Sequence, residues 1–356
     1  MACKLRTAER KLPDEENLGV TGKIKQEGQK GRRQPLADLD GRNISNRGGG
    51  PDVVNPMRKP ELKDDDPGEG YTGKQLADMD PDEDDANNDP HMVSDYVNEV
   101  FAYLRQLEMQ QPIRRNFLDG HETTVKQRSV LLNWLVEVHS DFKLSLDTLY
   151  LCVSVLDRYL QGDKTVSKTT LQLVGVTAMI IASKYEDIDA PHIQDFVYVC
   201  DKAFAKKEVI KMELQILKAL DFKLGKAGSI HFLRRYNKIA RVTGKHHNLG
   251  KYLLELALLE YKFAHEAPSM VAAAVCVLSI AIIDNVKKLR PIWTPALQTC
   301  SSYRYVDIKR IINNVITLVR FASNSKYRAV KQKYALSRNE GISMSHILFR
   351  VEQLII

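Results

Sequence analysis

Residues 171–183 read Leu-Gln-Leu-Val-Gly-Val-Thr-Ala-Met-Ile-Ile-Ala-Ser, and this stretch decides the fold class. Apolar side chains would cover nearly every side of a helix here, so we expect the helix to lie inside a layer of other helices. A second stretch of this kind, residues 270–278, can be laid over residues 173–181 at an offset of 97 residues. The two stretches favour a helical protein with two lobes.

Amphipathic helices are predicted around both stretches. One follows Ser94, and a possible capping box at Thr124 and Gln127 starts another. Further helices are predicted over residues 149–160, 207–220 and 249–263. No alternating run bounded by hairpin turns requires a sheet, so the predicted class is all-α.

The first 92 residues have a different composition. They contain 8 of the 13 prolines, 11 of the 19 glycines and a single aromatic residue, Tyr71. Such a segment cannot bury enough apolar surface to offset its chain entropy, so we expect residues 1–92 to form a disordered tail. Residues 1–47 carry a net charge of +4 and residues 48–92 a net charge of −9, and the acidic run at 78–85 is interpreted as a solvated spacer.

The rest of the chain is basic, with 37 basic and 25 acidic residues from residue 93 onward. No zinc-finger or RNA-binding motif accompanies this charge, so we expect no nucleic-acid partner. The longest uncharged run has 17 residues, which is shorter than the ~20 that span a bilayer. Five widely spaced cysteines and the lack of a secretory signal indicate reduced thiols in a cytosolic or nuclear protein.

The motifs of common enzyme classes are absent, including nucleophile elbows, phosphate-binding loops and zinc-protease helices. His246 and His247 lie in a loop-like stretch with no further metal ligand at suitable spacing, so no metal site is predicted. Asp157 and Glu137 could form an acid–base pair, but structural ion pairs are commoner on such helices. We therefore expect a binding module with no catalytic residue and no cofactor.

Four ordered motifs resemble the cyclin family. Residues 127–138, Gln-Arg-Ser-Val-Leu-Leu-Asn-Trp-Leu-Val-Glu-Val, are similar to the first helix of the cyclin box, although Gln127, Ser129 and Asn133 depart from the usual Met, Ala and Asp. Residues 156–160 (Leu-Asp-Arg-Tyr-Leu), 182–187 (Ala-Ser-Lys-Tyr-Glu-Asp) and 211–222 follow the later motifs. Residues 103–108 and 233–235 look most like B-type mitotic cyclins.

The resemblance covers residues 93–350 and implies two tandem five-helix repeats preceded by a short helix and the tail. It divides the chain into a tail (1–92), a kinase-binding cyclin box (93–226) and a second cyclin fold (227–356). It also implies a regulatory subunit that binds and activates a mitotic cyclin-dependent kinase, without chemistry of its own, in cytoplasm and nucleus.

The kinase-binding residues that the resemblance implies are Lys184, Glu213, Tyr96, Val100, Phe222 and Glu186. Lys184 ends a helix that is almost wholly apolar, so we expect its ammonium to be partly desolvated and compensated by Glu213. A purely intramolecular strut between two helices is the alternative. Arg128 and Asp157 are expected to form a structural ion pair in the core.

The family's docking groove for Arg-x-Leu peptides of substrates maps onto six residues. They are Gln127, Val130, Leu131, Trp134, Glu137 and Gln172. An apolar cleft would take the leucine and Glu137 the arginine, whereas an ordinary core stripe is the alternative. Gln127 in place of methionine removes apolar area, so we expect weaker docking.

The tail carries a segment that resembles the destruction box, with Arg33, Leu36, Asp38 and Leu39 in place and Gly41 at the last position. The resemblance implies capture by the anaphase-promoting ubiquitin ligase and degradation at mitotic exit. Two other classes stay open from the sequence. A TFIIB-like transcription factor shares the two-repeat fold but usually carries a zinc ribbon, and a helical enzyme is disfavoured by the missing motifs.

Overall fold

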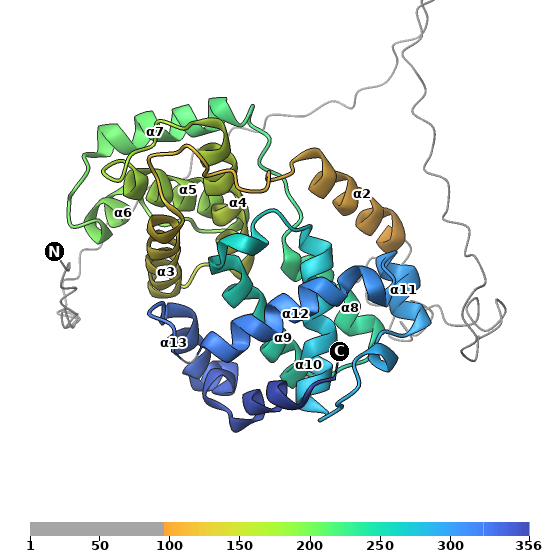
Figure 1. Cartoon of the computed structure of the whole chain (residues 1–356). Helices are drawn as coiled ribbons and strands as arrows, with labels where there is room; N and C mark the ends of the chain where they lie inside the picture. The colour runs from red at the N-terminus through yellow and green to blue at the C-terminus, as the bar shows by residue number, and fades with distance from the viewer. Residues whose placement is uncertain (1–95, 323, 356) are drawn as a thin grey trace, which may run out of the picture. The chain divides into compact units, whose positions relative to one another are not determined.

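The computed structural model describes residues 96–322 and 324–355, and these residues are helical almost throughout (Figure 1). A first helix, α2 (Val97–Gln110), precedes two lobes. In the described part of the chain, pairing of β type is limited to one isolated bridge between Lys288 and Ile355. The expected all-α class is confirmed there, whereas the predicted tail and its destruction-box residues lie outside the described residues.

Each lobe contains five α-helices, as the resemblance implied. The helices of the first lobe are α3 (Val125–Asp141), α4 (Leu146–Gly162), α5 (Leu171–Glu186), α6 (Ile193–Val199) and α7 (Lys206–Ala219). Those of the second lobe are α8 (Ser229–Ile239), α9 (Gly244–Leu259), α10 (Pro268–Ile283), α11 (Pro295–Ser301) and α12 (Tyr305–Ala322). Two short 3-10 helices lie inside the second lobe, η3 (Tyr261–Phe263) and η4 (Arg290–Ile292). After α12 come α13 (Ala329–Ala335) and three more 3-10 helices, η5 (Ser337–Asn339), η6 (Ile342–Met344) and η7 (His346–Gln353).

The two all-apolar helices lie at the centres of their lobes. Helix α5 packs against α3, α4, α6 and α7, and α10 packs against α8, α9 and α12. Every residue of α5 from Leu173 to Ser183 is buried, and α10 is buried to a similar extent. The sequence prediction of two interior helices is therefore confirmed.

Local sequence signals explain where several helices begin. The predicted capping box of α3 is present: the Gln127 backbone N–H donates to Thr124 Oγ1 at 3.3 Å, and the Thr124 N–H donates to Gln127 Oε1 at 2.8 Å. The prediction of a loop at His246 and His247 is wrong, because both residues lie in α9. Thr243 and His246 form a capping box, with the Thr243 N–H donating to His246 Nδ1 at 3.2 Å.

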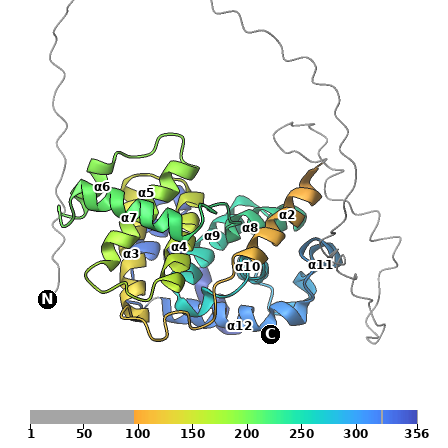
Figure 2. The same ribbon diagram turned by 90° about the horizontal axis from the view of Figure 1, so that it is seen from above.

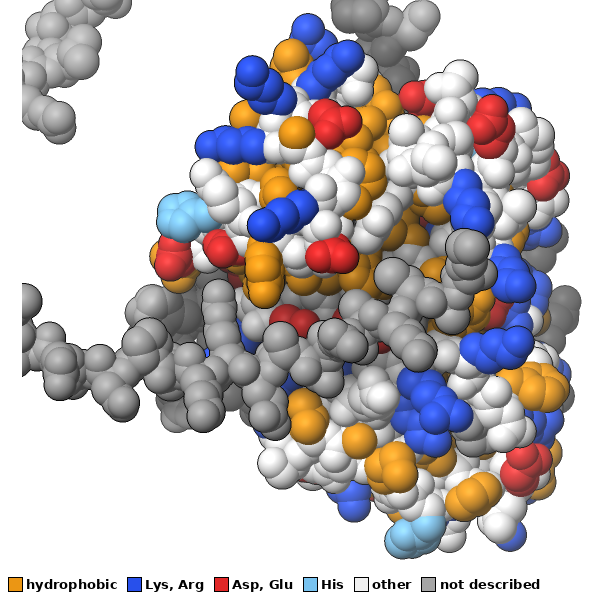
Figure 3. All heavy atoms as spheres, turned by 90° about the vertical axis from the view of Figure 1, so that its left-hand side faces the viewer, with side chains coloured by type: hydrophobic (Ala, Val, Ile, Leu, Met, Phe, Trp, Pro, Cys, Tyr) orange, Lys and Arg blue, Asp and Glu red, His pale blue; other side chains and the backbone are white. Residues whose placement is uncertain are grey.

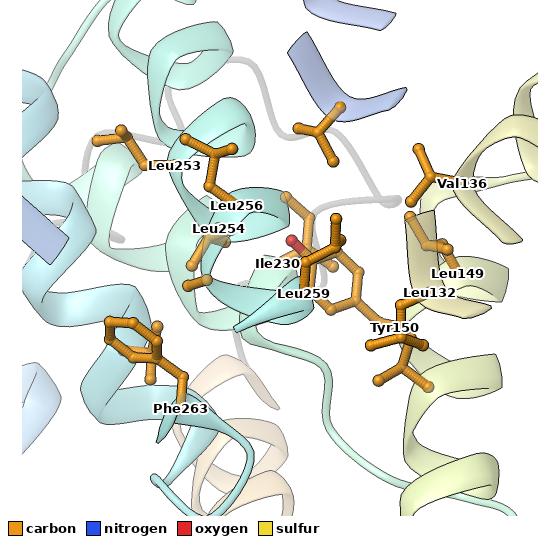
Figure 4. Packing of buried hydrophobic residues seen from close by; sticks show 14 of the residues in the cluster. Leu132, Val136, Leu149, Tyr150, Ile230, Leu253, Leu254, Leu256, Leu259 and Phe263 are labelled. Atoms are coloured by element: carbon orange, nitrogen blue, oxygen red, sulfur yellow. The ribbon is translucent and has the colours of Figure 1, made fainter. Parts of the chain in front are cut away.

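The two lobes share an apolar interface. Figure 4 shows Tyr150 between Leu132 of the first lobe and Ile230 and Leu259 of the second. Polar contacts add to this packing, because the Ala329 N–H at the start of α13 donates to Asn133 Oδ1 on α3 at 3.0 Å. Both kinds of contact fix the second lobe against the helices that carry the candidate sites.

Candidate functional site

The C-terminal end of α5 brings the first candidate pair together. Lys184 Nζ lies 2.6 Å from Glu213 Oε1 on α7. Ser183 is fully buried, but the helix leaves the core one residue later, so Lys184 and Glu186 are exposed. The pair therefore stands where the central helix of the first lobe reaches the surface.

The expected desolvation of the Lys184 ammonium is wrong. Its side chain is 53% exposed, whereas that of Glu213 is 17% exposed. The last turn of α5 projects beyond its neighbouring helices, and a long lysine side chain there keeps its charged end in water. Because exposed pairs contribute about 0–1 kcal/mol, this pair adds little to folding stability and leaves the ammonium accessible to a partner.

Exposed apolar side chains surround the pair. Ile210 and Leu214 on α7 are each 48% exposed and flank Glu213, and Tyr185 is 55% exposed. The sequence analysis missed these three residues. The signal was present in α7, where Ile210 and Leu214 lie beside the buried stripe of Val209 and Ile216. We call Lys184, Tyr185, Ile210, Glu213, Leu214 and Phe222 the α5–α7 cluster.

Phe222 belongs to this cluster through an unusual backbone conformation. Asp221 and Phe222 have φ angles of +52° and +55°, and the Phe222 N–H donates to Leu217 O at 2.9 Å at the end of α7. Bulky residues rarely adopt this left-handed conformation, and such strain is typical of functional sites. The turn leaves the Phe222 ring 61% exposed instead of folding it into the core.

Glu186 lies at the same end of α5, in a different electrostatic setting. Partial burial and the nearby carboxylate of Asp147 raise its pKa, and His231 on α8 partly opposes this shift. The side chain therefore lies beside groups at the junction with the second lobe.

Tyr96 and Val100 lie on a separate element. They occupy the N-terminal end of the α2 region and are 64% and 44% exposed. Viewed from above, α7 and α2 both face the viewer, α7 on the left and α2 on the right (Figure 2). A partner that covers this side could contact both the α5–α7 cluster and α2.

Arg128 and Asp157 form a buried, bidentate pair. Arg128 Nε lies 2.7 Å from Asp157 Oδ1, and Nη2 lies 2.6 Å from Oδ2. Arg128 is fully buried, and its Nη1 also donates to Leu259 O of the second lobe at 3.4 Å. Asp157 is thus engaged by Arg128, and Glu137 is bonded to Asn133, so the two carboxylates do not form an acid–base pair.

The six residues of the expected docking groove lie on α3 and α5 with different exposures. Val130 is 53% exposed, Trp134 is half-buried, and Leu131 is 6% exposed because it packs against Gly175 of α5. Gln172 and Glu137 are also half-buried. The Gln127 side-chain oxygen accepts from the Thr124 N–H at the start of α3, so its amide takes part in the capping box. On the face seen in Figure 3, hydrophobic side chains reach the surface in a band that has charged side chains of both signs around it.

Asn133 is a site residue whose role the sequence analysis did not identify. Its Oδ1 accepts from the Ala329 N–H, so its Nδ2 faces Glu137 and donates to Oε1 at 3.1 Å. Burial raises the pKa of Glu137, and this hydrogen bond opposes the shift. The departure from the family's usual Asp at this position was the available signal.

No group of three or more His, Cys, Asp and Glu side chains in the described residues could hold a metal ion. Three cysteines in this part of the chain, Cys152, Cys200 and Cys276, are free and buried. No helix within the described ranges is long and apolar enough to cross a membrane.

Comparisons with known proteins agree with the resemblance. The Cyclin, N-terminal domain family matches residues 99–225, and the Cyclin, C-terminal domain family matches residues 228–348. A G2/mitotic-specific cyclin-B of Patella vulgata is 42% identical over 291 residues, which cover 82% of this chain and 69% of that protein. A G2/mitotic-specific cyclin-B2 of Oryzias luzonensis is 42% identical over 288 residues, or 80% of this chain and 73% of that protein.

Among solved structures, a viral cyclin from herpesvirus saimiri superposes with a TM-score of 0.56 at 25% identity. The match covers 63% of this chain and 97% of the viral chain. Two cyclin domains in tandem, the identity to mitotic cyclins and the shared helical architecture lead to one conclusion: the chain belongs to the cyclin family, as a homologue of the G2/mitotic-specific B-type cyclins.

Proposed function

We propose that this chain is the regulatory subunit of a mitotic cyclin-dependent Ser/Thr kinase, which it binds and activates at the G2/M transition. The observation that carries the proposal is the α5–α7 cluster, in which an accessible Lys184–Glu213 pair stands among exposed apolar side chains. An exposed apolar patch with polar residues among it is typical of a protein-binding surface. The identity to mitotic cyclins supports a kinase as the partner.

Activation requires that the cluster bind the active kinase conformation more tightly than the inactive one. A shift of the kinase from 1% to 99% active needs a preference of about 10⁴-fold. Apolar contacts by Ile210, Leu214 and Phe222 would supply most of the affinity. Lys184 and Glu213 would orient the kinase by binding its backbone carbonyl and amide groups.

The test is co-purification of the kinase with Lys184→Ala, together with phosphotransfer by the reconstituted complex. We expect the variant to remain folded but to lose at least tenfold in kinase affinity, because the accessible ammonium is removed without disturbing the core. Lys309→Ala, an exposed lysine on α12, is the matched control. Wild-type protein that activates no cell-cycle kinase would overturn the proposal.

The division of the chain follows from the same proposal. Residues 93–226 form the kinase-binding box, residues 227–356 form the second cyclin fold, and residues 1–92 form a regulatory tail. The protein would work in both cytoplasm and nucleus during the cell cycle. Fractionation of synchronised cells tests this distribution.

We also propose that the α3–α5 groove docks Arg-x-Leu peptides of substrates. The exposed Val130 and half-buried Trp134 would receive the leucine, and Glu137, oriented by Asn133, would bind the arginine. Trp134→Ala should weaken the binding of an Arg-x-Leu peptide without affecting kinase binding. Equal affinity of variant and wild type for the peptide would refute the groove.

The tail proposal rests on Arg33, Leu36, Asp38 and Leu39, which resemble the destruction box read by the anaphase-promoting ubiquitin ligase. The double substitution Arg33→Ala with Leu36→Ala should stabilise the protein at mitotic exit. Nearby lysines, such as Lys30, could accept ubiquitin. Disappearance of the double variant on the normal schedule would contradict this role.

A further inference from the structure

Helix α2 lies outside both five-helix repeats, and the only buried residue among its 14 is Glu108, which is 9% exposed. Phe101 and Leu104 are partly buried, whereas Tyr96, Val100 and Tyr103 are exposed. An isolated helix of this length is marginal in water, so α2 depends on contacts with the rest of the protein. A helix with so little apolar burial must be held in place largely by polar contacts.

The first polar contact joins Glu108 to the N-terminus of α10. Glu108 Oε2 accepts from the Ser269 N–H at 3.0 Å, and Oε1 accepts from Ser269 Oγ at 2.6 Å. Ser269 is fully buried in the first turn of α10, where backbone N–H groups lack partners within the helix. A carboxylate at this position satisfies an N–H group and interacts favourably with the helix dipole.

The second contact involves Arg105, one turn before Glu108. Its guanidinium donates to the Ser301 carbonyl oxygen and lies 5.3 Å from the Tyr303 ring centroid. The Tyr303 hydroxyl lies 2.7 Å from Ser269 Oγ, which has already donated its proton to Glu108 and therefore accepts here. Arg105, Tyr303, Ser269 and Glu108 thus form one connected network, which we call the α2 anchor.

We propose that the second lobe controls kinase binding through the α2 anchor, with Arg105 and Glu108 acting as positioning residues for Tyr96 and Val100. This inference rests on the proposed kinase-binding function. The anchor residues of α10 and α11 belong to the second lobe, which the kinase proposal does not otherwise use. By holding α2 in place, the anchor removes the entropy cost of ordering that helix when the kinase binds.

The test compares Glu108→Gln, Ser269→Ala and the double variant in the full-length chain. Because hydrogen bonds to a charged group contribute strongly, we expect each single variant to raise the Kd for the kinase on the order of tenfold. The double variant should bind the kinase as tightly as the single variant that binds it less well, because both substitutions break the same contact. Glu99→Gln removes the same charge from an exposed position of α2 and is the matched control.

Two further measurements separate positioning from general destabilisation. Hydrogen exchange of the chain without kinase should accelerate over residues 97–110 in Ser269→Ala, while α5 stays protected. In a Tyr96→Ala, Val100→Ala background, Ser269→Ala should cost little additional kinase affinity, because the anchor acts through those two side chains.

The possible outcomes are distinct. If wild type binds the kinase and Ser269→Ala and Glu108→Gln bind it equally well, the inference is overturned and the kinase proposal stays intact. Unchanged exchange over α2 would overturn the anchor itself. Failure of wild type to bind any kinase would remove both the proposed function and this inference.

Discussion

Phe222 illustrates how one residue can serve binding at the expense of stability. Its left-handed backbone and exposed ring are both unfavourable for folding, yet they leave the ring on the surface just after α7, where a partner can reach it. A residue without Cβ adopts this backbone without strain. Folding stability and kinase binding should therefore respond to substitution in opposite directions at this position.

We expect Phe222→Gly to be more stable than Phe222→Ala by about 1 kcal/mol, because glycine tolerates a φ of +55°. Both variants should lose kinase affinity to a similar degree. Urea unfolding measures the first effect and a kinase-binding assay the second. Lys202→Gly, with a φ of +56° after α6, is a control that should gain stability with no loss of binding, and equal stability of the two Phe222 variants would contradict the account.

His139 should make the protein sensitive to acid. Burial, followed by the nearby Lys333, lowers its pKa to about 4, while its Nε2 lies 2.8 Å from Ser145 O. Glu255 and Asp187 partly oppose this shift. The unfolded chain takes up this proton near pH 6.5 and the folded chain only near pH 4, so stability is full above pH 6.5 and falls between these values.

The expected loss from this one residue is about 3 kcal/mol between pH 7 and pH 4. His139→Gln keeps a donor for the Ser145 carbonyl but cannot titrate. Unfolding free energies measured across this range should fall less steeply for the variant than for wild type. Parallel curves would show that His139 does not carry the effect.

Individual side chains also show how far the sequence could be interpreted. Resemblance to known motifs was enough to pair Lys184 with Glu213 and Arg128 with Asp157, and the structure brings both pairs together. The expected partial desolvation of the Lys184 ammonium was wrong, because an apolar helix pattern does not tell where the helix leaves its neighbours. The bond between Asn133 and Ala329 spans 196 residues, which local sequence patterns cannot reveal.

At the scale of elements, α3 and α5 pack tightly at Gly175, where the Leu131 side chain occupies the space of a Cβ atom. A Cβ atom added there would lie 2.8 Å from both methyl carbons of Leu131, which is shorter than normal contact. Leu131 also forms the floor of the proposed docking groove. The distance between these two helices therefore affects both the core and the groove.

We expect Gly175→Ala to destabilise the protein by about 1–3 kcal/mol through overpacking. It should also weaken Arg-x-Leu peptide binding, because Leu131 or α3 must move. Gly244→Ala is the matched control, since nothing lies within 4 Å of a Cβ atom at that position. Thermal unfolding and peptide titration of both variants test the expectation, and equal behaviour of the two would refute it.

Apolar patterns predicted α2, α3, α4, α5, α7, α9 and α10, whereas the number of five helices in each lobe came from the family resemblance, and several helix ends could not be predicted. Helix α4 begins at Leu146 instead of residue 149, because Ser145 Oγ accepts from the Thr148 N–H and caps the helix. Helix α9 begins at Gly244 because His246 replaces the usual Glu or Gln of a capping box. In both helices the cap lies before the first residue of the apolar pattern.

For the whole molecule, the shared interface between the lobes predicts cooperative unfolding. Tyr150 packs against the second lobe, and the fully buried Arg128 bonds to both Asp157 and Leu259. The two tryptophans report on different lobes, Trp134 on the first and Trp293 on the second. Each can therefore follow the unfolding of its own lobe.

We expect Trp134→Phe and Trp293→Phe to each show one unfolding transition. Within each variant, fluorescence of the remaining tryptophan and far-ultraviolet circular dichroism should give the same midpoint, because neither lobe can unfold without exposing the shared interface. The two variants need not share one midpoint, since Trp293 is buried and Trp134 is half-buried, so the two substitutions cost different amounts of stability. Separate midpoints within one variant would contradict the expectation.

The network at Glu108 and Ser269 also sets a lower limit on the size of a useful fragment. A piece that ends at the linker after α7 would keep Lys184 and Glu213 but would leave Glu108 without the Ser269 N–H and hydroxyl that donate hydrogen bonds to it. Any shortened activator built from this chain must therefore extend beyond Tyr303, which retains α10 and α11 even though neither helix carries a residue of the α5–α7 cluster.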